Sequence, residues 1–242
     1  MNIRLDNIKN FKDVLMNTEL FIDEVKFELD SEGMRFRGLD KSHVSFISVI
    51  IDSDYFTDFN IDVPCSCICD TNELVKVLKR AKNDDKLLLS FDDTDLELQF
   101  INGNVRRKFK IRQVDMVYDS PDKPQIRFPE TFEVSIKQFI ESIKDAELYS
   151  DKVKLQTNDN QFSIISDGDL GDYKSNLELS ENVRDCSSVF SLEWLKKIFK
   201  TNIGGDVKIS MGDNMPLFLE FDDKLGLRAE FLLAPRIEND YE

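Results

Sequence analysis

Apolar residues recur at helical spacing in four short stretches of the chain. Phe11, Val14 and Leu15 fall on one side of a helix near residues 9–17, because positions three and four apart in sequence meet on one helical face. The same spacing predicts three further helices, over residues 72–82, 136–145 and 191–200.

Between the helices, alternating or continuous apolar runs predict β-strands. Turn signals such as Ser31-Glu32-Gly33 and Asn102-Gly103-Asn104 separate neighbouring runs. The expected strands cover residues 24–29, 34–39, 44–51, 87–91, 96–100, 105–111, 152–157, 161–166, 207–211 and 217–221. Each half of the chain then has two helices on an antiparallel sheet, which is an α+β arrangement.

The same order of predicted elements occurs in both halves of the chain. Residues 9–27 match residues 137–155 without a gap, and a second pair of segments, around Lys76 and Lys196, also matches. A repeat of this length is a whole small domain. The prolines and weak periodicity of the central segment indicate a connector. We therefore predict an N-terminal domain over residues 1–117, a connecting loop over 118–130 and a C-terminal domain over 131–242.

Composition narrows the class of protein. The chain has 242 residues, 41% of them hydrophobic, and a formal net charge of −15, which indicates a globular acidic protein. No apolar run approaches the ~20 residues that span a bilayer, and the first residues lack a signal-peptide pattern. We expect no membrane association and a location in the compartment of synthesis.

Four cysteines, Cys65, Cys67, Cys69 and Cys186, raise the question of a metal site. Three of them alternate, so that on a strand they share one face. Zinc ligands are usually spaced C-x₂₋₄-C and need a fourth partner. We therefore expect reduced, partly buried thiols in a reducing compartment and no metal or cofactor.

Charge is distributed unevenly along the chain. The four predicted helices hold eleven Lys or Arg against five Asp or Glu, whereas the whole chain has 32 basic and 47 acidic residues. Solvated helix faces often carry lysine, but four equivalent basic helices in a −15 protein favour a surface that lies beside phosphates.

Helical geometry separates the basic residues from the apolar ones. In the fourth helix Trp194, Leu195 and Ile198 oppose Lys196, Lys197 and Lys200. No aromatic platform interleaves these lysines in the sequence, so stacking of single strands is not expected. A smooth basic face in contact with duplex DNA fits the pattern better.

Several motifs resemble the sliding clamps of the proliferating cell nuclear antigen type. The segment Asp40-Lys41-Ser42-His43-Val44 is similar to the D-x-S-H-V segment of that family, and Leu233 to Glu238 is similar to its C-terminal L-A-P-K/R-I-E. Residues 74–83 resemble its second helix, and Asp213 to Leu217 its D-x-P-L strand entry. The resemblance covers the full length, including the duplication, and is closest to the archaeal clamps.

The resemblance implies a homotrimeric ring of six domains, whose helices line a hole that surrounds duplex DNA without reading its sequence. The implied function is that of a DNA polymerase processivity factor, not an enzyme. The DNA-facing candidates are Lys12, Lys76, Lys79, Arg80, Lys82, Lys137, Lys144, Lys196, Lys197 and Lys200.

The resemblance also implies a pocket beneath the connecting loop that binds a short partner segment, the PIP box, through one aliphatic and two aromatic anchors. Expected partners are DNA polymerase, flap endonuclease and DNA ligase. The candidate pocket residues are Leu39, His43, Val44, Phe46, Ile126, Phe128, Pro129, Pro216, Phe218, Leu232, Leu233, Ala234, Pro235, Arg236 and Ile237.

Subunits of the family join edge to edge by strand addition. The segments at the corresponding positions are basic around residues 106–116 and mildly acidic around 172–180, and the interface candidates are Lys108, Lys110, Arg112, Lys174, Leu177 and Leu179. The chain has no G-x-x-x-x-G-K-[ST] of its own, so a clamp loader of the replication factor C type is an expected partner. The expected location is the cytoplasm, on chromosomal DNA, or the nucleus if the source is eukaryotic.

Two other functions fit parts of the sequence. Acidic runs at Asp52-Ser53-Asp54 and Asp92-Asp93-Thr94-Asp95 could hold Mg²⁺ in a metal-dependent hydrolase, but Asp is also favoured at turns. The chain could instead be one subunit of a heterotrimeric clamp. His43, the only histidine, has no nucleophile beside it in sequence, so we expect it to line the pocket or serve the structure.

Overall fold

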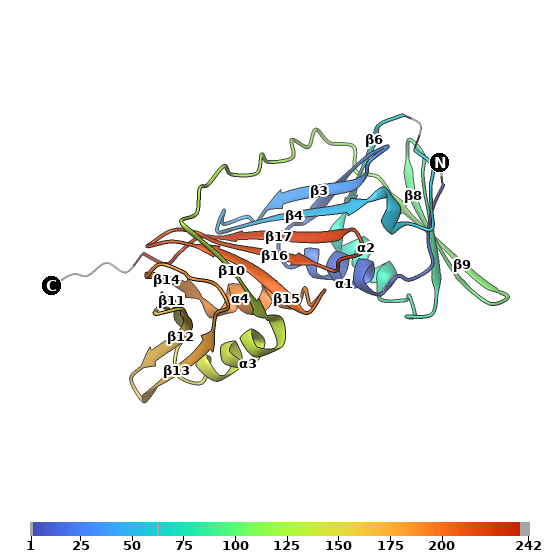
Figure 1. The fold of residues 1–242 in the computed structure, drawn as a ribbon. Helices are drawn as coiled ribbons and strands as arrows, with labels where there is room; N and C mark the ends of the chain where they lie inside the picture. Colours follow the sequence, from blue (N-terminus) through green and yellow to red (C-terminus); the bar gives the residue numbers. More distant parts are fainter. Residues whose placement is uncertain (1, 62, 238–242) are drawn as a thin grey trace. The chain divides into compact units, whose positions relative to one another are not determined.

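A computed structural model describes residues 2–61 and 63–237 of the chain. The chain folds into two compact units (Figure 1). Unit 1 is Met1–Lys123 with Asp222–Ala229, and unit 2 is Pro124–Phe221 with Glu230–Glu242. Strand β17 (Leu227–Leu233) runs across this division. The domain boundaries expected at residues 118 and 130 stay predictions.

Unit 1 holds two sets of antiparallel strands. One is a five-stranded sheet in the order β5 (Asp58–Phe59), β1 (Asn2–Leu5), β7 (Lys86–Phe91), β8 (Asp95–Asn102) and β9 (Val105–Arg112). The other runs in the order β6 (Cys65–Asp70), β2 (Glu24–Asp30), β3 (Gly33–Leu39) and β4 (Ser45–Asp52), followed in the chain by a 3-10 turn at Ser53–Tyr55.

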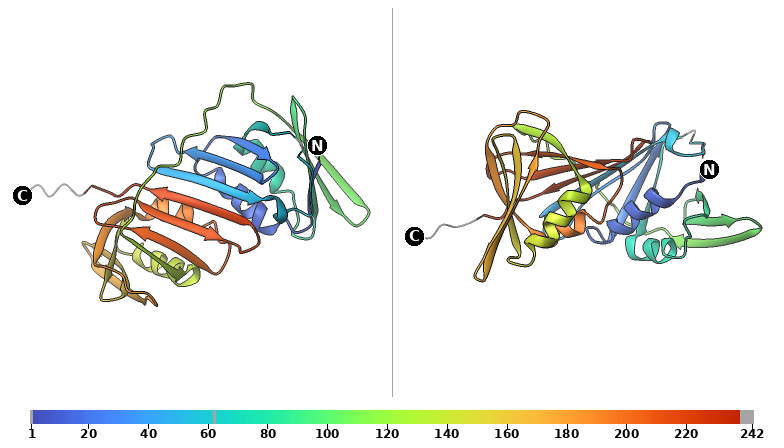
Figure 2. Two further views of the ribbon diagram at one scale, coloured as in Figure 1. Left: turned by 45° about the horizontal axis from the view of Figure 1, so that its top comes forward. Right: turned by 60° about the horizontal axis from the view of Figure 1, so that its bottom comes forward.

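Unit 2 repeats this arrangement. One sheet has the order β13 (Gly171–Glu178), β12 (Gln161–Gly168), β11 (Lys152–Asn158) and β14 (Cys186–Ser191). The other set runs in the order β10 (Glu130–Ser135), β15 (Asp206–Met211) and β16 (Leu217–Asp222). Figure 2 shows the strands of each set running side by side.

Each unit also has two helices, as predicted. These are α1 (Lys9–Thr18) and α2 (Thr71–Leu78) in unit 1, and α3 (Ile136–Ala146) and α4 (Leu192–Ile198) in unit 2. The two helices of a unit contact one another. The carboxylate of Asp70 accepts the N–H of Glu73 at 2.9 Å, so Asp70 is the residue that caps α2.

The apolar face of each helix is buried in its own unit. Phe139 of α3 is fully buried, and its ring lies 4.6 Å from that of Phe199 and 5.4 Å from that of Phe162. Phe11, at the equivalent place in α1, is 1% exposed and meets Phe56 at 6.3 Å. Interior aromatic pairs of this kind stabilise a core beyond the area that they bury.

Two of the four helices end earlier than their amphipathic pattern indicates. α2 ends at Leu78 and α4 at Ile198, and each is followed by a hydrogen-bonded turn. Several strands of the structure are not predicted by the sequence pattern. The side chains of β14 are mostly small or polar, and β10 begins at the last residue of the expected connecting loop.

Candidate nucleic-acid interface and partner-docking segments

The cations predicted to face DNA all reach the surface of their unit. Lys12 and Lys197 are half-buried, and the exposed ones are Lys76, Lys79, Arg80, Lys82, Lys137, Lys144, Lys196 and Lys200. The ammonium of Lys12 donates to the Ala81 carbonyl at 2.7 Å, which ties α1 to the end of α2. The other basic side chains belong to a polar helix surface, opposite the buried face.

Half of these cations have a carboxylate neighbour. Lys76 pairs with Glu73 at 2.6 Å, and Lys144 with Glu141 at 2.8 Å. Glu19 pairs with Lys79 at 3.7 Å, and the other pairs are Lys196 with Glu147 and Lys197 with Glu193. Exposed ion pairs of this kind contribute little to stability, because water and salt screen the attraction between the charges. A phosphate can therefore displace the carboxylate.

Apart from Lys12, whose ammonium is bound to the Ala81 carbonyl, four of the predicted cations form no ion pair within the part of the chain that the structure describes. They are Arg80, Lys82, Lys137 and Lys200. Arg80 lies in the turn that closes α2, where a cation also complements the helix dipole, and Lys82 follows that turn. These four exposed cations have no carboxylate of the described residues to displace before they meet a phosphate.

Unit 2 has a groove beside α4 that the sequence does not predict. It has a volume of about 580 Å³ and is lined by residues 147–151, Leu192, Glu193, Lys196, Lys197 and Lys200. Tyr149, 39% exposed, is part of this wall. The ammonium of Lys197 lies 4.3 Å from the centre of the Trp194 ring. The expected separation of Trp194 from the lysines of the fourth helix is therefore wrong for Lys197.

One predicted docking segment is the loop after β3 in unit 1. The buried carboxylate of Asp40 accepts hydrogen bonds from the N–H groups of Ser42 and Val44, both at 2.7 Å. It also accepts hydrogen bonds from the N–H of Ser45 and from the hydroxyl of Ser42. Burial alone would raise the pKa of Asp40, but these hydrogen bonds outweigh it and hold the pKa below its ordinary value. The loop is therefore fixed by one side chain.

This geometry presents the only histidine to solvent. His43 has a left-handed backbone, with φ 57°, and its N–H donates to the Asp40 carbonyl at 2.9 Å. His43 and Leu39 are exposed, Val44 is half-buried and Phe46 is 3% exposed. Phe46 is therefore core, while the first three can meet a partner.

The other predicted docking residues belong to unit 2. Phe128 stacks on Phe218 with ring centres 6.1 Å apart, and Ile126 and Pro216 are half-buried. Pro129, which is exposed, lies near Gly212, where an added Cβ would be 2.8 Å from the proline ring. The aromatic stack gives this segment an apolar surface that solvent still reaches.

The C-terminal tail divides into buried and exposed parts. Leu232 and Leu233 are buried, Ala234 and Pro235 are half-buried, and Ile237 is 86% exposed. The N–H of Arg236 donates to the Val189 carbonyl at 2.7 Å. Its guanidinium donates to both carboxylate oxygens of Asp151, at 3.0 and 2.8 Å. Glu238, the last residue of the motif, lies outside the described residues.

The predicted interface segments form sheet edges. Strand β9 ends the five-stranded sheet of unit 1, and its exposed face carries Lys108, Lys110 and Arg112. Lys108 pairs with Glu97 at 2.7 Å and Lys110 with Asp95 at 3.7 Å. Arg112 lines a hollow of about 780 Å³ together with residues 93–95 and 113–116.

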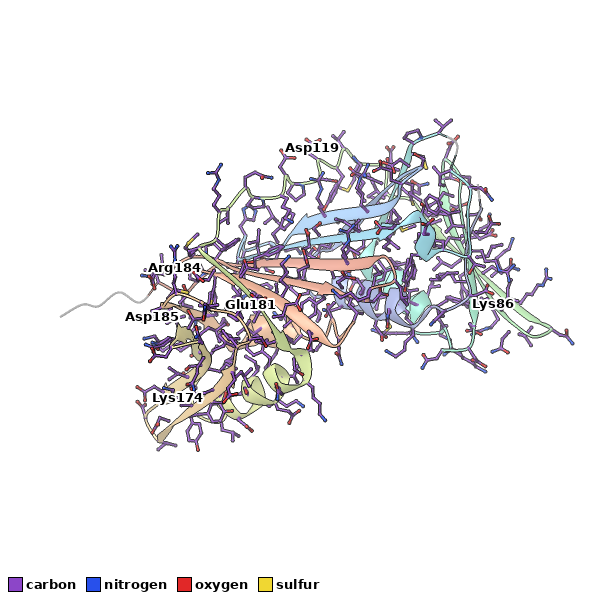
Figure 3. The ribbon with its side chains drawn as sticks, in the orientation of Figure 1. Lys86, Asp119, Lys174, Glu181, Arg184 and Asp185 are labelled. Atoms are coloured by element: carbon purple, nitrogen blue, oxygen red, sulfur yellow. The ribbon has the colours of Figure 1, made fainter. Side chains whose placement is uncertain are left out.

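Strand β13 ends the four-stranded sheet of unit 2. Lys174, labelled in Figure 3, is exposed on this strand, while Leu177 and the following Leu179 are half-buried. Both edges therefore offer unpaired backbone N–H and C=O groups for a further strand.

Arg107 is a functional candidate that sequence reasoning missed. It lies on β9, donates to the Arg80 carbonyl at 2.7 Å, pairs with the buried Asp85 and lies 5.5 Å from the centre of the Phe100 ring. It thus joins the sheet edge to the end of the basic helix α2. Its partners are distant in sequence, so no local pattern indicates this role.

The residues that suggested a metal enzyme have structural roles. Asp92 accepts the N–H groups of Thr94 and Asp95, at 2.9 and 2.7 Å, as expected for a turn, and Asp52 pairs with Arg228 at 3.2 Å. Among the described residues, no cluster of His, Cys, Asp and Glu could hold a metal ion.

The cysteines are free thiols, and burial raises the pKa of Cys67 to about 12. A thiol with so high a pKa is unreactive at neutral pH. No described helix is long and apolar enough to cross a membrane.

Comparison with known proteins extends these observations. A family model described as the N-terminal domain of proliferating cell nuclear antigen matches residues 1–121. The DNA polymerase sliding clamp of Methanobrevibacter smithii is 36% identical over 222 residues, which cover 90% of this chain and 91% of that protein. The sliding clamp of Methanothermobacter thermautotrophicus is also 36% identical, over 221 residues and 90% of each chain.

Solved structures with this fold are clamps as well. The PCNA of A. fulgidus, solved with the C-terminal region of FEN-1 bound, has a TM-score of 0.90 at 24% identity and covers 99% of each chain. The PCNA2–PCNA3 complex from Sulfolobus tokodaii has a TM-score of 0.89 at 24% identity and covers 98% of this chain and 100% of that one.

These comparisons confirm the resemblance and the α+β fold of duplicated clamp domains that the sequence predicts. Matches to the family model and to relatives above 30% identity over most of the chain leave no need for an enzymatic interpretation of the acidic runs. The chain belongs to the proliferating cell nuclear antigen family of DNA polymerase sliding clamps, which are processivity factors and not enzymes.

Proposed function

We propose that three copies of this chain close into a ring around duplex DNA, with the basic helices α1 to α4 of each copy turned toward the DNA. The observation that carries the proposal is the concentration of cations on four helices of a protein whose net charge is −15. Contacts with phosphates alone are independent of sequence, which suits a protein that slides.

The two sheet edges support ring closure. Strand addition between β9 of one copy and β13 of the next would satisfy the free backbone groups of both. Four exposed cations lie on β9, while Asp172 and Glu178 are exposed on β13 beside Lys174, so the joint has partial charge complementarity. A heterotrimer with related chains is the alternative outcome.

Partner proteins are proposed to dock on the loop of Leu39 to Phe46 in unit 1 and on the connector and tail of unit 2. The A. fulgidus clamp solved with the C-terminal region of FEN-1 supports flap endonuclease as one partner. DNA polymerase and DNA ligase are proposed to use the same segments through PIP boxes. A clamp loader of the replication factor C type would open the ring, and the working location would be chromosomal DNA in the cytoplasm.

Mass and topology test this function together. Light scattering on the purified chain should give three times the 28.1 kDa of one copy. Clamps loaded onto a nicked circular plasmid should stay bound at high salt and be released when a restriction enzyme linearises the DNA. A monomeric mass, or equal retention on circular and linear DNA, would contradict enclosure.

Charge reversal separates the two parts of the proposal. Replacing Arg80, Lys137 and Lys200 by Glu should weaken the salt-dependent binding of the clamp to linear duplex DNA while the trimer persists, because phosphate contacts are lost and the edges are untouched. Replacing Lys110 and Arg112 by Glu should shift the trimer toward monomer in sedimentation. An unchanged trimer after the second substitution would exclude an electrostatic joint at β9.

A further inference from the structure

The two units share a five-residue turn after their first helix. Residues 19–23 read Glu-Leu-Phe-Ile-Asp, and residues 147–151 read Glu-Leu-Tyr-Ser-Asp. The N–H of Leu20 donates to the Asn17 carbonyl at 3.0 Å, and that of Leu148 to the Asp145 carbonyl at 3.2 Å. The next N–H in each turn repeats the pattern. The two turns therefore have the same backbone, and their contacts can be compared position by position.

The glutamate that opens each turn contacts a basic helix. Glu19 pairs with Lys79 at 3.7 Å, just after α2, and Glu147 pairs with Lys196 on α4. Each turn thus begins on a residue that holds one of the cations proposed to face DNA.

The aspartate that closes each turn contacts the start of the same helix through its main chain. The Asp23 carbonyl accepts the N–H of Thr71, the first residue of α2, at 2.7 Å. The Asp151 carbonyl accepts the N–H of Leu192, the first residue of α4, at 3.0 Å. The first N–H groups of a helix have no partner within it, so these bonds fix the turn to the helix.

The side chain of the same aspartate pairs with a docking segment. Asp23 pairs with Lys41, in the loop that carries His43, and Asp151 accepts both arms of Arg236 in the tail. The hydrogen bond to Asp23 raises the pKa of Lys41. The hydrogen bond from Arg236 lowers the pKa of Asp151. A two-armed arginine–carboxylate pair also fixes direction.

We propose that Asp23 and Asp151 are positioning residues, each of which fixes one partner-docking segment to the start of a basic helix. Partner affinity then depends on two carboxylates that do not touch the partner. This inference rests on the proposed docking role of the loop and the tail. The same residue makes the same two attachments in both copies of the repeat, with a lysine as the cation in one and an arginine in the other.

These ion pairs are exposed, and their exposure limits what they contribute to the stability of the fold. The side chains of Lys41 and Asp151 are 85% and 76% exposed, and such pairs contribute little to the stability of a fold. Their removal should leave the ring assembled and folded while the docking segments lose their fixed position. We therefore expect removal of these ion pairs to lower partner affinity and to leave the melting temperature nearly unchanged.

The test titrates a labelled peptide of the C-terminal region of FEN-1 into the assembled clamp and follows its fluorescence anisotropy. Asp151→Asn and Arg236→Met should each weaken binding about two- to fivefold, and the double variant should be no weaker than either single one. The reversed pair Asp151→Arg with Arg236→Asp should recover part of the loss. Asp23→Asn and Lys41→Met should behave likewise in the first copy.

Asp167→Asn is the matched control, because Asp167 is an exposed carboxylate of unit 2 that forms no ion pair among the described residues. It should bind the peptide as the unchanged chain does. If Arg236→Met weakens binding while Asp151→Asn does not, Arg236 contacts the partner directly and the inference is overturned. If the unchanged clamp fails to bind the peptide, the proposed docking function fails, and that result is distinct from equal binding by all variants, which would overturn the inference alone.

Discussion

The equivalent turns of the two units begin with the same backbone hydrogen bonds but differ in the exposure of their central side chains. In unit 1 the central residues Phe21 and Ile22 are 4% and 5% exposed. In unit 2 the residues at these positions are Tyr149, which is 39% exposed, and Ser150, which is half-buried, and both line the groove beside α4. The two ends of the turn therefore form ion pairs in both units, whereas the side chains in its middle differ in type and in exposure.

A glycine on the second strand after each turn explains the difference. Gly38 on β3 leaves room for Ile22, whose Cγ2 would lie 2.4 Å from a Cβ at that position. In unit 2 the residue at the place of Ile22 is Ser150, and Gly168 instead admits the carbonyl of Tyr149, 1.9 Å from where a Cβ would be. A glycine at the end of the strand thus accommodates a side chain in one unit and backbone in the other.

The largest difference between the units should follow removal of the equivalent buried phenylalanines. Phe139→Ala should destabilise unit 2 by about 3–5 kcal/mol, because truncation of a buried aromatic leaves a cavity. Phe11→Ala should cost unit 1 somewhat less, since Phe11 has one close aromatic neighbour and Phe139 has two. Hydrogen exchange of the strands of each unit measures the two effects separately. Equal losses would show that the aromatic neighbours add nothing.

The second-largest difference in stability should come from the turn that follows the first helix of each unit. Phe21→Ala should destabilise unit 1 by about 2–4 kcal/mol because the side chain is buried, whereas Tyr149→Ala should change the stability of unit 2 by less than about 1 kcal/mol. Thermal unfolding of the two variants at equal protein concentration compares them. A larger loss for Tyr149→Ala would mean that its exposed ring packs against something essential.

The docking loop of unit 1 should respond to acid through the buried carboxylate of Asp40. The folded pKa of Asp40 lies below the ordinary value of 3.8, so its contribution to stability is present above that pH and is lost as the pH falls through the folded pKa. The loop after β3 should therefore lose its amide protection as the pH falls below about 4. Asp40→Asn should loosen the loop at neutral pH, at a cost of about 1–3 kcal/mol. A variant loop that stays protected would assign the loop's order to other contacts.

The smallest effects should come from the helix ion pairs. Glu73→Gln in α2 and Glu141→Gln in α3 remove equivalent i,i+3 pairs with Lys76 and Lys144, and each should shift the melting temperature by no more than about 1–2 °C. Both variants should bind linear duplex DNA up to a slightly higher salt concentration, because a cation is freed for phosphate. Weaker binding after either substitution would mean that the carboxylate orients its lysine toward the DNA.

Sequence reasoning was most successful for the helices and for the family. The four helices and the duplicated order are confirmed, because an apolar face and a repeat are both local patterns. Strands such as β14, with the sequence Cys-Ser-Ser-Val-Phe-Ser, were not predicted, because small polar residues become strand only when a neighbouring strand pairs with them. The candidate site residues stay predictions until the experiments above are done.

The amino-acid sequence alone determined the amphipathic helices, their excess of cations and membership of a clamp family, since each depends on residue type and spacing. Only the tertiary structure decided that Arg236 turns back to Asp151, that Arg107 reaches the end of α2 and that Tyr149 joins the lysines of α4. These contacts join residues far apart in the chain. They exist because packing of helices against sheets brings the residues together, and no local pattern of polarity encodes such a meeting.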